Sequence, residues 1–171
     1  VAMDYDNRSY LTASGGVAAR IDLLGNRQVV FTGPAGSTVV AVLLDQDGAS
    51  YAIALNQGSS VGRVLIRDLQ GAITQIAQFP AAIAAMTQDL KSLTIDYLVA
   101  LSAQVGRSTL WRVFRRGQPP PLPQPIGNLS AALRGFAQDY DRPGTLFAIS
   151  TGAPAGQIVA INPAAGSFTT L

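Results

Sequence analysis

Aspartates separated by a single residue are the recurrent ionisable groups of this sequence. The pairs are Asp4 with Asp6, Asp45 with Asp47, and Asp139 with Asp141. Their carboxylate oxygens suit Ca²⁺, but each pair lacks the third acid and the bidentate Glu of an EF-hand loop. Aspartate also accepts hydrogen bonds from backbone N–H groups a few residues further on, which stabilises turns. We therefore interpret the pairs as turn residues, with calcium binding as the alternative.

The amino-acid composition excludes most common kinds of catalytic site. The chain has ten Asp but no Glu, no His and no Cys. Ser-His-Asp and Cys-His arrangements are therefore excluded, as are thiolate and imidazole metal sites. A hydrolase that uses paired aspartates stays as an alternative, but no pattern brings two carboxylates together. The sequence predicts a non-catalytic protein and assigns no catalytic, metal or cofactor residue.

Aromatic residues recur at one place in the sequence pattern. Tyr10, Tyr51 and Tyr97 occupy equivalent positions in apolar runs, and Leu146 occupies the fourth. A lectin would use repeated surface aromatics in this way to stack on sugars. Large side chains at equivalent places also pack between neighbouring repeats. The replacement by Leu146 favours packing, and a carbohydrate-binding lectin is the alternative.

The third repeat holds the single Trp111 and the cluster Arg112, Arg115 and Arg116. Trp111 lies between apolar residues, so we expect it to pack. We interpret the arginines as a solvated strand end, with an anionic partner as the alternative. The other basic residues are scattered and the net charge is only +2, so nucleic-acid binding is not expected.

A repeat of 40 to 50 residues must position these side chains. The closing glycines Gly25, Gly71, Gly117 and Gly166 lie 46, 46 and 49 residues apart. Such a period is typical of stacked supersecondary units. Charged residues make up only 13% of the chain, with one Lys and no Glu. Because Lys and Glu favour helices and Asp favours turns, this composition predicts strands and tight turns.

The sequence predicts an all-β, propeller-like array of four four-stranded antiparallel blades in a single repeat-built domain, residues 1–171. The approximate blade boundaries are 1–35, 36–79, 80–127 and 128–171. The second repeat is clearest, with strands at 38–44, 51–55, 63–67 and 73–76. Residues 79–90 are rich in Ala and could form a helix in isolation, but their alignment favours a leading strand. The proline-rich segment 118–125 replaces a turn and part of an outer strand, because proline supplies no backbone donor. We interpret it as a blunted edge, with a docking strip as the alternative.

Two segments carry a resemblance to known repeats. The turn Asp45–Gly48, the Tyr51-containing strand and the run Gly62–Leu69 resemble NHL-like and gluconolactonase-like β-propellers. The segment Gly156–Gly166 is similar to a strand-and-turn motif common in propellers. The resemblance implies six to eight blades as the common range, so four indicate a small ring, part of a larger propeller, or chains that complete one another. It implies a Glu metal ligand in gluconolactonase-like enzymes, and this chain has none.

These observations together predict a binding or structural module outside the cytoplasm, either extracellular or periplasmic. Its expected partners are another protein, or further blades of the same or another chain in a larger polypeptide or an oligomer. No apolar run approaches 18 residues, so no membrane span is expected. The chain opens at Val1 without an initiator Met, which indicates a processed or excised segment.

Overall fold

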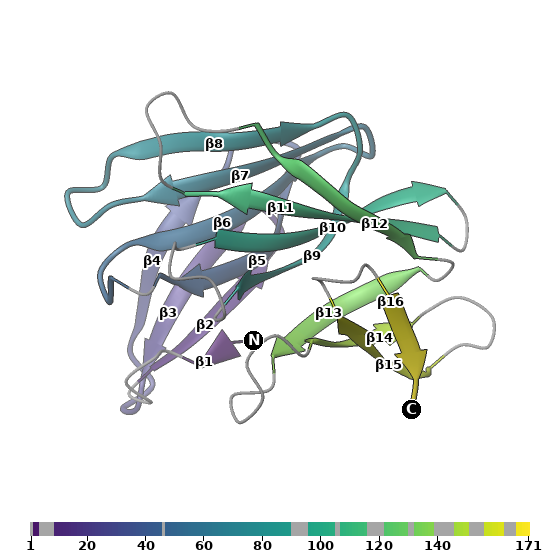
Figure 1. Ribbon diagram of the computed structural model, residues 1–171. Coiled ribbons are helices and arrows are strands. Elements are labelled where there is room, and N and C mark those ends of the chain that lie inside the picture. The colour runs from purple at the N-terminus through teal and green to yellow at the C-terminus, as the bar shows by residue number, and fades with distance from the viewer. Residues whose placement is uncertain are drawn as a thin grey trace. The chain divides into compact units, whose positions relative to one another are not determined.

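The protein is built from four separate four-stranded antiparallel sheets (Figure 1). The computed structural model describes residues 2–3, 9–45, 47–89, 96–104, 107–115, 122–129, 132–138, 146–150, 156–162 and 167–171. In each sheet every strand pairs with the strand that precedes or follows it in the chain. None of the described residues is helical. This all-β meander, repeated four times, is the blade arrangement of a β-propeller, which confirms the predicted fold class.

The chain divides into two compact units, residues 1–82 and 83–171. The first unit holds the first and second sheets. The first sheet comprises β1 (Ala2–Met3), β2 (Ser9–Ser14), β3 (Val17–Asp22) and β4 (Arg27–Thr32). The second sheet comprises β5 (Ser37–Leu44), β6 (Tyr51–Gln57), β7 (Val61–Arg67) and β8 (Ile73–Phe79).

The second unit holds the third and fourth sheets. The third sheet comprises β9 (Ile83–Asp89), β10 (Asp96–Gln104), β11 (Arg107–Phe114) and β12 (Gln124–Leu129). The fourth sheet comprises β13 (Leu133–Gln138), β14 (Leu146–Ser150), β15 (Ile158–Asn162) and β16 (Ser167–Thr170). Because Ile83–Asp89 is a strand, the helical alternative for residues 79–90 is wrong, and pairing with β10 outweighs local helix preference.

The end of the proline-rich segment behaves as an edge, as predicted. Gln124 and Pro125 begin β12, which lies at one margin of the third sheet. The ladder with β11 shifts register between Leu110 and Trp111, where Pro125 pairs with Trp111. Proline is tolerated at such a margin because one side of the strand needs no ladder donor. Residues 118–121 lie outside the described part of the chain.

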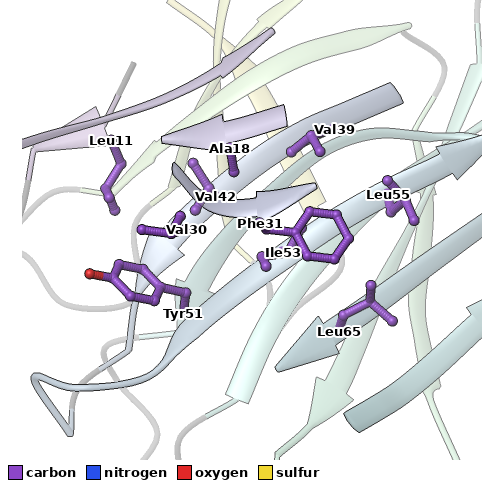
Figure 2. Close-up of a cluster of buried hydrophobic side chains, with 10 residues drawn as sticks. All are labelled: Leu11, Ala18, Val30, Phe31, Val39, Val42, Tyr51, Ile53, Leu55 and Leu65. Carbon is purple, nitrogen blue, oxygen red and sulfur yellow. The ribbon is translucent and has the colours of Figure 1, made fainter. Parts of the chain in front are cut away.

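Adjacent sheets in the first unit pack face to face around an apolar core. Figure 2 shows ten of its buried residues, which come from both sheets: Leu11, Ala18, Val30, Phe31, Val39, Val42, Tyr51, Ile53, Leu55 and Leu65. In β6 five consecutive residues from Tyr51 to Leu55 are buried. Since successive side chains of a strand point to opposite faces, both faces of the second sheet are covered.

The second unit repeats this packing between its own two sheets. Its core contains Leu98, Ala100 and Leu110 from the third sheet, together with Leu146 and Val159 from the fourth. The strand β13 lies against β9. Burial of these apolar side chains contributes roughly 1.5–3 kcal/mol each for the larger residues, which is the main force holding one blade to the next.

Three outer strands carry a bulge at equivalent places, a feature absent from the sequence interpretation. In the first sheet Ala18 pairs with Phe31 while Ala19 pairs with Val29, which leaves one extra residue between them. The extra residues in β4, β8 and β12 are Val30, Ile76 and Ile126. A bulge turns two successive side chains towards one face. This explains why Val30 and Phe31 are both buried.

Candidate functional site

The two aspartates of the second repeat have different surroundings. Asp45 is fully buried, whereas Asp47 is exposed. Asp47 Oδ1 accepts hydrogen bonds from the backbone N–H groups of Ala49 (2.9 Å) and Ser50 (2.7 Å). Its Oδ2 accepts one from Ser50 Oγ at 2.7 Å. The turn then closes through Gly48, whose φ is 68°, a conformation that glycine adopts readily. Asp47 therefore does what the turn interpretation predicts.

The other two predicted pairs cannot be compared in the same way. Asp4, Asp6, Asp139 and Asp141 all lie outside the described residues. Within the ranges that the structure describes, no three acidic side chains gather into a group that could hold a metal ion.

Two further aspartates lie at the turns that join the third and fourth strands of the first and second sheets. Asp22 is the last residue of β3, just before the loop to β4, and Asp68 directly follows β7 in the loop to β8. Asp22 Oδ1 accepts from the N–H groups of Leu24 (2.9 Å) and Asn26 (2.8 Å), and Asp68 Oδ1 accepts from that of Ala72 (2.8 Å). Side-chain and backbone hydrogen bonds from Asn26 lower the pKa of Asp22 below its ordinary value of 3.8. These acids are turn residues as well.

Arg112 corrects the prediction for the arginine cluster. Its guanidinium Nη2 lies 3.2 Å from Oδ2 of Asp89, whose side chain is buried. Arg112 stands opposite Leu98 in the ladder of β10 and β11, on the face that carries the core. The prediction of a solvated strand end is therefore wrong for Arg112, because its guanidinium pairs with the buried carboxylate of Asp89. Arg115 is half-buried and Arg116 lies outside the described part of the chain.

The recurrent aromatic position is a packing position in three sheets. Tyr51, Tyr97 and Leu146 are buried, while Tyr10 is 40% exposed. Trp111 is half-buried, and its Nε1–H donates to Thr109 Oγ1 at 3.1 Å. Three buried members do not form the row of exposed rings that a lectin would use.

The fourth sheet carries an apolar pocket of about 260 Å³. Its lining comes from β13, β14 and β15: Gly135, Phe136, Ala137, Phe147, Ala148, Ile149 and Ile158. Gly135, with φ of 76°, occupies the extra position where β13 shifts register against β14. The pocket offers hydrophobic contact and no ionisable group. Sequence alone does not reveal this pocket, because an apolar strand is expected to be covered.

Comparison with known proteins identifies the fold but no family or activity. No family model and no curated protein matches the chain. Among solved structures, the putative TolB from Agrobacterium tumefaciens has a TM-score of 0.69 and 16% identity, with 98% of this chain and 59% of that chain covered. TolB from Acinetobacter baumannii has a TM-score of 0.66 and 11% identity, with coverage of 97% and 41%. A luciferin-regenerating enzyme has a TM-score of 0.63 and 11% identity, with coverage of 100% and 61%.

These likenesses place the chain among β-propeller repeat proteins by fold. The chain spans about three fifths or less of the length of these structures. No helix among the described residues is long and apolar enough to cross a membrane.

Proposed function

We propose that this chain is a non-catalytic binding or structural module made of propeller blades, arranged as one repeat domain. The observation that carries the proposal is that described aspartates make structural contacts. Asp22, Asp47 and Asp68 hold turns, and Asp89 pairs with Arg112. The pocket of the fourth sheet is apolar. Hydrophobic contact is what such a surface supplies, and its natural partner is another apolar protein surface.

A hydrolysis assay tests the non-catalytic part. The 171-residue chain is incubated with a simple lactone in the presence of Ca²⁺, Mg²⁺, Mn²⁺ or Zn²⁺. We expect no turnover above the rate without protein. Turnover that rises with protein concentration and is lost in Asp47→Asn or Asp89→Asn would contradict the proposal and favour an aspartate-dependent hydrolase.

We also propose that the module works outside the cytoplasm. Support comes from the sequence, whose surface segments are rich in Asn, Gln, Ser and Thr and poor in charge. Fractionation of the source cells, with an antibody against the chain, checks this. Recovery in the cytosolic fraction would overturn it.

A further inference from the structure

The turn before β6 contains a chemically reactive pair of residues. Asp47 is followed by Gly48, and no other Asp or Asn of the chain precedes a glycine. Because glycine has no side chain, its backbone nitrogen reaches the carboxyl group of a preceding aspartate with little steric hindrance. A five-membered ring closes most readily at such a pair. Asp47 and Gly48 are both exposed, so water reaches them.

In the folded turn the two groups that would react are already hydrogen-bonded elsewhere. The Asp47 carboxylate accepts from the N–H groups of Ala49 (2.9 Å) and Ser50 (2.7 Å) and from Ser50 Oγ (2.7 Å). The N–H of Gly48 donates to the backbone oxygen of Asp45 at 2.9 Å. Ring closure requires the carboxyl carbon of Asp47 to meet the nitrogen of Gly48. These hydrogen bonds therefore oppose it.

Two other turns supply an internal comparison. Asp22 and Asp68 also accept hydrogen bonds from backbone N–H groups. Each of them is followed by a leucine, Leu23 or Leu69, whose side chain hinders the approach of its own backbone nitrogen. The three turns thus use their carboxylates alike, and only the turn at Asp47 combines this use with a following glycine.

We propose that Asp47 is a site of spontaneous isoaspartate formation, which the turn suppresses while the second sheet is folded. The nitrogen of Gly48 bonds to the side-chain carboxyl carbon of Asp47, and the carboxyl hydroxyl leaves with the amide proton as water. The product is a succinimide. Water then adds to one of its two carbonyl carbons, and the bond from that carbon to nitrogen breaks. Opening at the side-chain carbonyl restores aspartate, whereas opening at the backbone carbonyl yields isoaspartate, with no oxidant or reductant required.

Isoaspartate at residue 47 disrupts the start of β6. The main chain then runs through the former side chain and is longer by one CH₂ group. The hydrogen bond from the Asp45 N–H to the Ser50 oxygen, 2.9 Å long, depends on the native spacing. The next residue, Tyr51, is buried and pairs with Leu44 in the ladder of β5 and β6. The modification therefore lowers the stability of the second sheet, and refolding does not reverse it.

Ageing of the 171-residue chain at neutral pH and physiological temperature tests the proposal. Trypsin releases the peptide from Gln28 to Arg63, which contains residue 47, and electron-transfer fragmentation locates isoaspartate within it. Methylation by an isoaspartyl methyltransferase with labelled S-adenosylmethionine measures the amount. We expect accumulation in urea, and accumulation roughly tenfold or more slower in the folded chain, because the turn must open first. Absence of isoaspartate at residue 47 in urea, or equal rates in the two conditions, would overturn the proposal.

Three variants test the protective role of the turn. Ser50→Ala removes the hydroxyl that donates to Asp47 Oδ2 and should raise the rate in the folded chain about threefold or more. The matched control is Ser59→Ala, which changes an exposed serine between β6 and β7 and should keep the native rate. Both variants should match the native chain in urea. Asp47→Glu, whose ring would have six members, should give no label at this position.

Circular dichroism checks that the serine variants are folded before their rates are compared. Equal rates for folded Ser50→Ala and Ser59→Ala would overturn protection by the turn. Label that persists in Asp47→Glu would place the reaction at another residue and overturn the assignment to Asp47. If Ser50→Ala unfolds, the comparison of the native chain with and without urea still decides the proposal.

Discussion

The second and fourth sheets share a strand pattern but differ in their surroundings. In the second sheet Ala54 and Val64 are buried, and residues Tyr51 to Leu55 are covered on both faces. In the fourth sheet β14 alternates, with Leu146 and Ala148 buried and Ile149 exposed. Identical topology therefore does not fix burial. Three residues after Leu146 the fourth sheet exposes Ile149, whereas three residues after Tyr51 the second sheet buries Ala54.

Introducing one charge into both sheets should give the largest difference. Ala54→Asp places a carboxylate where no surface is exposed, which costs several kcal/mol for the buried ion. Since a domain is stable by only about 5–15 kcal/mol, we expect the variant to unfold. Ile149→Asp should keep a native circular dichroism spectrum. If both variants unfold, or neither does, the distinction between the two sheets is wrong.

Truncation of aliphatic side chains at equivalent positions should give a smaller contrast. Leu110→Ala removes a buried core side chain of the third sheet, with an expected cost of about 2–5 kcal/mol. Ile158 pairs with Ile149 as Leu110 pairs with Ala100, but it is 52% exposed. Ile158→Ala should therefore cost below about 1 kcal/mol. Urea unfolding at low protein concentration measures both. Equal losses would contradict the difference in exposure between the two positions.

Substitutions in the turns should have a smaller effect on stability than substitutions on the sheet faces. Asp47→Ala removes an acceptor for the turn before β6 and should cost about 0.5–1.5 kcal/mol. Asp47→Asn keeps one oxygen acceptor, so its loss should be smaller. Thermal melting with and without millimolar Ca²⁺ checks the alternative. A rise of many degrees with Ca²⁺ that is absent in Asp47→Asn would establish a calcium site instead.

The smallest effect on stability is expected at acid pH, at the loop between β3 and β4. Hydrogen bonds lower the pKa of Asp22 in the folded chain below its ordinary value of 3.8. The ionised form therefore stabilises the fold above that value, and this contribution is lost as pH falls through the lower folded-state pKa. Asp22→Asn should flatten the dependence of melting temperature on pH in this acidic window. Its profile near neutral pH serves as the reference. Superimposable acid profiles for the two proteins would contradict this role.

The sequence predicts the blades well because glycine turns and apolar runs act locally. Asp45–Gly48 and Asp68–Gly71 end strands within one or two residues of their predicted limits. The structural use of Asp47 also follows from local turn chemistry. Arg112 was misjudged because its partner Asp89 lies 23 residues away, and spacing alone gives no sign of that contact.

Two other features depend on long-range packing and were missed for that reason. The exposure of Ile149 is one of them, because Leu146–Ser150 reads in sequence as an ordinary buried strand. The bulges place Val30 and Ile76 inward against the simple two-residue alternation of a strand. An apolar pair such as Val30 and Phe31 was the available signal, but a fully covered strand produces the same pair.

The bulged outer strands also limit how these molecules can aggregate. A sheet margin grows by adding another strand only if its backbone groups keep a regular spacing. The extra residues at Val30, Ile76 and Ile126 break that spacing along β4, β8 and β12, and Pro125 removes a donor as well. At these three margins, lateral strand addition into fibrils is disfavoured. The fourth outer strand, β16, keeps a regular ladder with β15, so among the outer margins it is the one where strand addition is expected at high concentration.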